Sequence, residues 1–118
     1  MRLHHVALRT RELPRLEEFY VRVLGLTVTR RDGVRGVWLD AGGVTVMLER
    51  ADTDEPPVAA GSKELVAFAI EAGEGPAWED RLARAGIKVE ARTEATLYVR
   101  DPDGRKVGVS AWPKGLAG

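Results

Sequence analysis

Two adjacent histidines, His4 and His5, are the side chains in this sequence best suited to acid–base chemistry near neutral pH. An imidazole can also ligate a metal ion. The chain contains no cysteine, which excludes thiol nucleophiles, disulfides and cysteine-based zinc sites. The chemistry predicted from residue types therefore centres on histidine, carboxylates and tyrosine.

Other catalytic patterns are weak. The only serines, Ser62 and Ser110, lie outside any Gly-x-Ser-x-Gly motif, and both histidines are at one end of the chain, so a catalytic triad is not indicated. No glycine-rich run matches a phosphate loop or a dinucleotide fingerprint. The segment 101–104, Asp-Pro-Asp-Gly, lacks the spaced acids and final glutamate of a calcium loop and indicates a turn.

Composition limits the classes of partner. The 118 residues suffice for one domain, and 44% apolar with 31% charged residues is ordinary for a soluble globular protein. Eighteen basic and eighteen acidic residues cancel, and no basic block suggests nucleic-acid binding. The sequence has no long apolar run of the kind that would indicate a membrane segment or a signal peptide. We expect a cytoplasmic protein with no nucleic-acid or membrane partner.

The elements that must position these residues follow the same order twice. A strand over residues 3–9 precedes a helix that begins near Pro14 and ends at Gly25, and strands follow at 26–31, 35–40 and 44–50. The second half repeats this order, with a strand at 64–71, a helix from Gly75 to Gly86, and strands at 87–92, 95–100 and 105–112. The last two strands flank the turn 101–104 and predict a hairpin.

The fold predicted from this order is α+β, with two βαβββ modules in one chain. The first module covers residues 1–50 and the second covers 63–112. Residues 51–62 carry prolines, acids and small residues and are interpreted as a connector, and 113–118 form a tail. We treat residues 1–118 as a single domain.

Two stretches resemble a known family. Phe19-Tyr20 with Val23-Leu24-Gly25-Leu26, and Tyr98-Val99-Arg100-Asp101-Pro102-Asp103-Gly104, are similar to the vicinal oxygen chelate superfamily. That superfamily includes glyoxalase I, extradiol dioxygenases, fosfomycin-resistance enzymes and bleomycin-resistance proteins. The resemblance covers nearly the whole chain and implies paired modules whose mixed sheets curve into a cup, usually in a homodimer.

The resemblance also assigns a metal site, which this sequence does not complete. Metal-dependent members use one residue on the first strand and one on the last strand of each module. Here those positions hold His5, approximately Met47, Leu65 where a second histidine is expected, and Gly108 where a glutamate is expected. A catalytic divalent ion needs about three N or O ligands. We therefore expect no metal cofactor.

One alternative metal site remains open. Glu49 lies two residues beyond Met47 and has the same facing on a strand, so His5 and Glu49 together form the best candidate for an irregular divalent site. His4 is not expected to share an ion with His5, because consecutive strand residues point to opposite faces.

Without metal, His5 has two interpretations: a hydrogen-bonded polar residue of the cup, or a ligand-contacting, acid–base group. Tyr98 matches an active-site tyrosine of extradiol dioxygenases, but it is equally consistent with an ordinary strand aromatic. Strand parity gives Arg100 the same facing as Tyr98, and Arg100 or Lys106 could pair with an acidic group of a ligand.

The predicted function is small-molecule binding in the cup without metal. The expected ligand-binding residues are His5, Met47, Leu65, Tyr98, Arg100 and Gly108, with His5 and Tyr98 as the candidate catalytic pair. The alternative is a metal-dependent enzyme built on His5 and Glu49, either a glyoxalase-type lyase or isomerase or a dioxygenase. Trp38 and Trp78 are expected to pack, and the sequence does not assign Trp112 to either role. The shape of the cup depends on how Val37, Met47, Leu65, Tyr98 and Trp112 pack.

Overall fold

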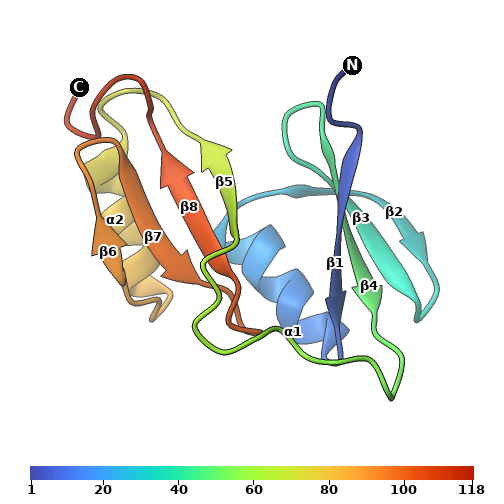
Figure 1. Cartoon of the computed structure of the whole chain (residues 1–118). Helices are drawn as coiled ribbons and strands as arrows, with labels where there is room; N and C mark the ends of the chain where they lie inside the picture. The colour runs from blue at the N-terminus through green and yellow to red at the C-terminus, as the bar shows by residue number, and fades with distance from the viewer. The chain divides into compact units, whose positions relative to one another are not determined.

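Each half of the chain folds into a helical segment and a four-stranded mixed sheet, in a computed structural model that describes residues 1–118 (Figure 1). The first half contains β1 (His5–Thr10), α1 (Leu13–Glu18), a π-helical segment (Phe19–Val23), β2 (Thr27–Asp32), β3 (Gly36–Asp40) and β4 (Thr45–Arg50). The second contains β5 (Leu65–Ala69), α2 (Gly75–Arg84), β6 (Ala91–Arg92), β7 (Thr96–Arg100) and β8 (Lys106–Ser110).

The two sheets have the same topology. Their strand orders are β1-β4-β3-β2 and β5-β8-β7-β6, and in each sheet the first and last strands of the module pair in parallel. The other pairs are antiparallel. The predicted α+β class and the repeated βαβββ order are confirmed.

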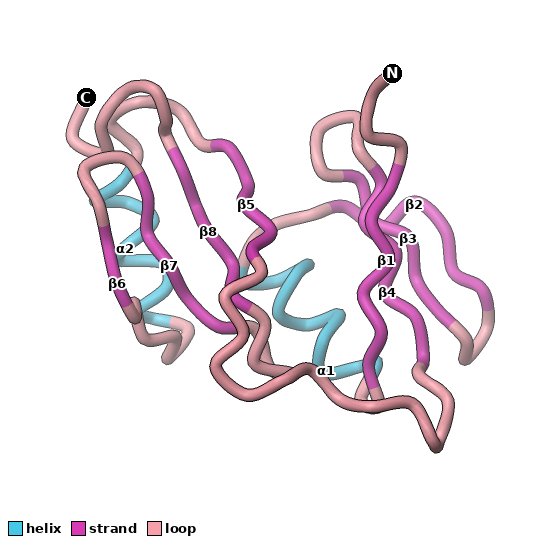
Figure 2. The backbone as a smooth tube through the Cα atoms, in the orientation of Figure 1, coloured by secondary structure: helices cyan, strands magenta, loops and turns pink.

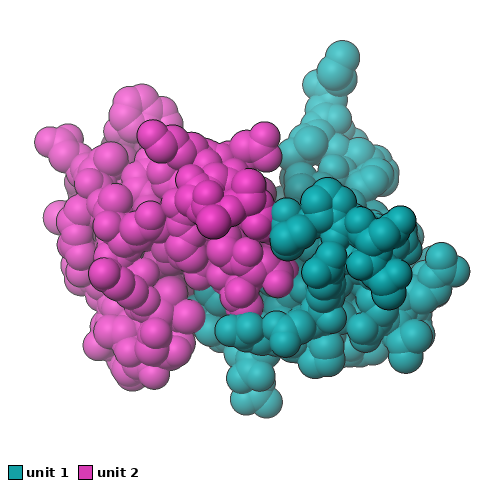
Figure 3. Space-filling model, turned by 60° about the horizontal axis from the view of Figure 1, so that its bottom comes forward, with its two compact units in different colours: residues 1–57 teal, residues 58–118 magenta.

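The chain divides into two compact units, Met1–Pro57 and Val58–Gly118, coloured separately in Figure 3. The division falls inside the segment 51–64, which joins β4 to β5 without regular secondary structure (Figure 2). None of the helices is long and apolar enough to cross a membrane.

Strand alternation separates a buried face from an open face in both sheets. In the first unit, the buried strand residues pack with the first helix and the π-helical segment; they are Leu8, Val37, Leu39, Val46 and Leu48, with Leu13, Leu16, Phe19 and Tyr20 from the helical segments. In the second unit the corresponding residues are Leu82 of α2 with Leu97, Val99, Val107 and Val109. The opposite face of each sheet carries the candidate site residues.

The hairpin between β7 and β8 forms as predicted. Gly104 has a φ of 89°, and its N–H donates to the carbonyl of Asp101 at 2.9 Å. The buried Asp101 carboxylate accepts from the backbone N–H groups of Asp103 and Arg105 and pairs with the Arg105 guanidinium at 3.0 Å. Because Asp101 is fully engaged within the turn, the segment is structural.

Three details differ from the sequence-based expectations. The first helix continues as a π-helical segment over its second half, with the Leu24 N–H bonded to the Phe19 carbonyl. The strand expected over 87–92 is only two residues long. Val37 belongs to the core and cannot shape a ligand site, while its neighbour Trp38 lies on the open face beneath the Arg30 guanidinium.

Candidate functional site

The open face of the second sheet brings three predicted site residues together. Tyr98 on β7 lies opposite Gly108 on β8, and Gly108 lies opposite Ala67 on β5. Leu65 begins β5 on the same face, two residues from Ala67. The alternation of β7 explains the facing of Tyr98, because Leu97 and Val99 on either side of it are fully buried on the core side.

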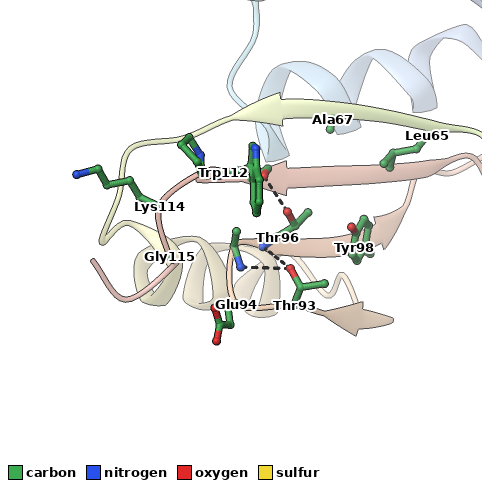
Figure 4. A pocket seen from close by; sticks show the side chains of 12 residues that line it. Leu65, Ala67, Thr93, Glu94, Thr96, Tyr98, Trp112, Lys114 and Gly115 are labelled. Carbon is green, nitrogen blue, oxygen red and sulfur yellow. Dashed lines mark hydrogen bonds between the residues drawn. The ribbon is translucent and has the colours of Figure 1, made fainter.

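A pocket of about 580 Å³ lies on this face. Leu65 and Tyr98 lie at one end, and the loop after β8 and the turn before β7 surround the other (Figure 4). The lining residues are Leu65, Ala67, Thr93, Glu94, Ala95, Thr96, Tyr98, Ser110, Trp112, Pro113, Lys114 and Gly115. The volume lies in the range of small-molecule sites in proteins.

Two aromatic rings supply most of the large apolar surface of this pocket. Trp112 is 79% exposed, an unusual position for a tryptophan. Tyr98 is half-buried, its hydroxyl has no hydrogen-bond partner in the chain, and the Lys106 ammonium lies over its ring. The Trp112 ring is therefore free to pack against a ligand, and a ligand at Tyr98 would lie beside a positive charge.

Hydroxyl groups between the rings are arranged by the protein itself. The Thr96 and Ser110 hydroxyls share a hydrogen bond of 2.7 Å, and the backbone N–H of Trp112 donates to the Ser110 hydroxyl oxygen at 3.2 Å. The Thr93 hydroxyl accepts from the Thr96 N–H at 3.1 Å (Figure 4). This chain of bonds fixes the polar floor of the pocket.

Two positively charged side chains, Lys106 and Arg100, lie beside the pocket and have different partners. The Lys106 ammonium lies 4.6 Å from the centre of the Tyr98 ring, a cation–π distance. The Arg100 guanidinium binds Glu90 at 2.7 Å and the carbonyls of Ser62 and Gly104 at 2.6 and 3.1 Å. The hydrogen bond from Arg100 is the main reason that the pKa of Glu90 is lowered. Arg100 therefore contributes to internal structure, whereas Lys106 faces the open side.

Gly108 lies in a tightly packed position, where a larger side chain would require its neighbours to shift by a few tenths of an ångström. A Cβ atom at this position would lie 3.2 Å from the Ala67 Cβ, 3.3 Å from the Thr96 Cγ2 and 3.5 Å from the Leu65 Cδ1. The Leu65 side chain thus lies in van der Waals contact distance of position 108, where the resemblance leads us to expect a glutamate in metal-dependent members. Both positions are apolar, and they pack against each other.

The remaining predicted residues belong to the first sheet. His5 is exposed and lies opposite Thr45 in the parallel register, while Met47 lies opposite Ala7 and Glu49 opposite Arg9. Glu49 is therefore four residues along the sheet from the level of His5. Its carboxylate is 3.4 Å from the Arg9 guanidinium.

The expectation that His4 and His5 cannot approach a common ion is wrong. Their Nδ1 atoms are 2.9 Å apart, and their rings meet edge to face. The reason is that β1 begins at His5, so His4 lies before the strand and the alternation of faces does not apply to it.

The four positions matched to the metal ligands of the family do not fit a divalent ion. They offer one imidazole, one thioether, one alkyl group and one glycine hydrogen, where such an ion needs about three N or O ligands. No three His, Cys, Asp or Glu side chains in the protein lie close enough together to hold a metal ion.

Sequence reasoning missed the walls contributed by loops. Residues 93–95 and 112–115 line the pocket, but they lie in turns whose course no periodic pattern predicts. The sequence leaves the role of Trp112 open, and the structure places this residue in the pocket lining. Its exposed position depends on how residues 111–118 return past the sheet, where the Leu116 N–H binds the Glu94 carbonyl at 2.8 Å.

Comparison with protein families gives one match, to the Glyoxalase/Bleomycin resistance protein/Dioxygenase superfamily, over residues 2–109. No protein of curated function matches the sequence.

Solved structures with a similar fold include a lactoylglutathione lyase from Agrobacterium tumefaciens (23% identity, 95% of this chain and 96% of that one, TM-score 0.76). The fosfomycin resistance protein FosX from Mesorhizobium loti is also similar (17% identity, 93% and 90% covered, TM-score 0.77). The FosX mutant from Listeria monocytogenes solved with Mn(II) and a dihydroxypropylphosphonic acid has 17% identity, with 93% and 89% covered and a TM-score of 0.76.

Proposed function

The chain belongs to the Glyoxalase/Bleomycin resistance protein/Dioxygenase superfamily, and within that family we propose that it binds a small, partly aromatic molecule without a divalent metal ion. The observation that carries the proposal is the pocket between Tyr98 and Trp112 on the open face of the second sheet. Two rings at opposite ends of a pocket of this size suit a flat or amphipathic ligand.

The polar groups of the pocket suggest how the ligand is oriented. The Tyr98 hydroxyl can donate to or accept from the ligand, and the Thr96–Ser110 pair offers lone pairs on its oxygens. Lys106 beside Tyr98 can attract an acidic substituent. Apolar walls with a few fixed polar groups are the usual composition of a small-molecule site.

The side chains at the positions matched to the family's metal ligands argue against a divalent metal ion at those positions. FosX from Listeria monocytogenes was solved with Mn(II), whereas here Leu65 and Gly108 stand where two of the family's ligands are expected. The irregular alternative, His5 with Glu49, receives little support, because Glu49 pairs with Arg9 four residues away from the level of His5.

Two measurements test the proposal. The first is the metal content of protein purified without a histidine tag, followed by calorimetric titration with nickel, zinc, manganese and ferrous ions. We expect no stoichiometric divalent ion. A tightly held divalent ion that His5→Ala abolishes would overturn the proposed function.

The second measurement is a screen of small aromatic and amphipathic acids by the fluorescence of Trp112. In a variant with Trp38→Phe and Trp78→Phe, Trp112 is the only tryptophan, so a ligand in the pocket changes its emission directly. Tyr98→Ala should weaken binding at least tenfold. Unchanged affinity in Tyr98→Ala or in Trp112→Ala, measured by calorimetry, would place the ligand elsewhere.

A further inference from the structure

The contact between His4 and His5 has the geometry of a shared donor–acceptor pair. The two Nδ1 atoms face each other at 2.9 Å, and the ring centres are 5.1 Å apart at an interplanar angle of 84°. One Nδ1 must donate a proton and the other must accept it. Both side chains are exposed, so this proton is accessible to solvent and to ions.

The backbone holds the two imidazoles in this arrangement. His5 is the first residue of β1 and lies opposite Thr45 of β4. The carbonyl of His4 accepts a hydrogen bond from the Thr45 N–H at 3.4 Å. Because both residues are tied to β4, the rings extend from a fixed segment of the first sheet.

All of the imidazole and thioether side chains of the protein, the groups that can bind copper, lie in the first unit. The chain has two histidines, two methionines and no cysteine, and these are Met1, His4, His5 and Met47. Met47 is half-buried on the open face that His5 shares, two residues along β4 from Thr45. Imidazole and thioether ligands together favour copper, and a thioether in particular favours its monovalent form.

We propose that His4 and His5 bind one Cu(I) ion through their two Nδ1 atoms. The imidazole that carries its proton on Nδ1 in this contact moves that proton to Nε2 by exchange with solvent, so both rings bind as neutral ligands and the copper keeps its oxidation state throughout. Metal–nitrogen bonds of about 2 Å on opposite sides of an ion require the two nitrogens to lie about 4 Å apart. The exposed rings can open from 2.9 Å to this separation by small side-chain rotations.

The choice of a monovalent ion follows from the number of ligands. Cu(I) is satisfied by two nitrogens in a line, whereas zinc and other divalent ions need further N or O ligands. No third His, Asp or Glu side chain joins the pair. The site is distinct from the pocket of the second sheet and does not depend on the function proposed for that pocket.

An anaerobic competition experiment with the chromogenic Cu(I) chelator bicinchoninate tests the inference. The tagless protein should withdraw one equivalent of Cu(I), and His4→Ala or His5→Ala should each lower the affinity at least tenfold. Glu49→Gln should leave it unchanged, which separates this site from the His5–Glu49 alternative. Thermal unfolding of both alanine variants should match the parent, since both side chains are exposed.

The ligating atoms can be read directly with Ag(I), a diamagnetic substitute for Cu(I). With only two histidines in the chain, the imidazole nitrogen spectrum contains two rings, and both Nδ1 signals should shift on adding one equivalent. One-bond coupling of silver to Nε2 in place of Nδ1, a change at one ring alone, or equal Cu(I) affinity in either alanine variant would overturn the proposal.

Discussion

At the scale of single residues, the surroundings of Gly108 limit what position 108 can carry. A Cβ atom there would be crowded by Ala67 at 3.2 Å and Thr96 at 3.3 Å, with the Leu65 Cδ1 next at 3.5 Å, an ordinary contact distance. A glutamate would need Ala67 and Thr96 to shift by a few tenths of an ångström, and we expect its longer side chain then to meet Leu65.

This contact predicts the behaviour of three variants. Gly108→Glu alone should cost about 1–3 kcal/mol in the free energy of unfolding, because it overpacks a filled position. Combining it with Leu65→His should relieve the crowding and create adjacent imidazole and carboxylate groups that bind nickel or zinc. Calorimetry and urea unfolding measure both effects.

The control combines Gly108→Glu with Leu65→Ala, which relieves the crowding without supplying an imidazole. It should regain stability and bind metal more weakly than the histidine variant. Full stability of Gly108→Glu alone would contradict the role assigned to Leu65.

A second prediction at this scale concerns Glu55, which binds the Arg9 guanidinium at 2.8 to 3.2 Å and accepts from the Asp52 N–H. Its pKa is lowered, first by the Arg9 hydrogen bond and then by the Asp52 N–H. An unfolded glutamate titrates near pH 4.3. The resulting stabilisation is complete above that pH and is lost as the pH falls through the lowered pKa of the folded state.

Glu55→Gln should therefore be less stable than the parent at pH 7, and the two should converge as the pH falls through the lowered pKa of Glu55. Thermal unfolding from neutral to acid pH measures the difference. Glu12→Gln, which removes an exposed partner of Arg15, is the matched control and should change little at any pH. A gap between parent and Glu55→Gln that stays constant throughout the acid range would contradict the assignment.

The facing of individual residues could be predicted from sequence where strands are regular. The alternation of side chains along a strand predicts Tyr98 and Arg100 on one face of β7 and the buried Leu97 and Val99 on the other. The same rule does not give the direction of the His4 side chain, because His4 lies just before the strand. Parity also says nothing about partners, so the ion pair of Arg100 with Glu90 could not be predicted.

At the scale of elements, α2 depends on the C-terminal segment that passes its first turn. The Gly75 N–H donates to the Leu116 carbonyl at 3.0 Å, and a Cβ on Gly75 would lie 2.5 Å from the Leu116 Cβ. Glycine is thus required at a helical position by close packing and not by its backbone angles.

Gly75→Ala should destabilise the protein, although alanine is better than glycine by about 1 kcal/mol in a free helix. Chemical unfolding shows whether Gly75→Ala lowers or raises the free energy of unfolding. In a chain truncated after Lys114 the same substitution should become neutral or stabilising, because Leu116 is gone. Stabilisation by Gly75→Ala in the full chain would show that the segment moves aside easily. Ala77→Gly, exposed in the same helix, controls for propensity and should cost about 1 kcal/mol.

The order and type of nearly all elements could be predicted from sequence, because apolar spacing and turn residues agree. Two features could not. The π-helical segment and the two-residue β6 depend on how neighbouring backbone groups pair, which side-chain periodicity does not record. The pocket walls at 93–95 and 112–115 are loops, and their positions depend on tertiary contacts.

At the scale of the whole molecule, membership of the superfamily leads us to expect a homodimer. Static light scattering of the tagless protein at micromolar concentration should give the mass of two chains. A mass of one chain across that range would contradict the expectation. The measurement should precede ligand titrations, because a dimer has two equivalent pockets and sets the stoichiometry.

The packing of Leu65 on Gly108 also has an evolutionary consequence. A side chain introduced at position 108 meets Ala67 and Thr96 first and Leu65 next, so its effect on stability depends on which residue occupies position 65. The two positions are therefore expected to change together. A larger residue at 108 should be tolerated more readily once Leu65 has been replaced by a smaller one.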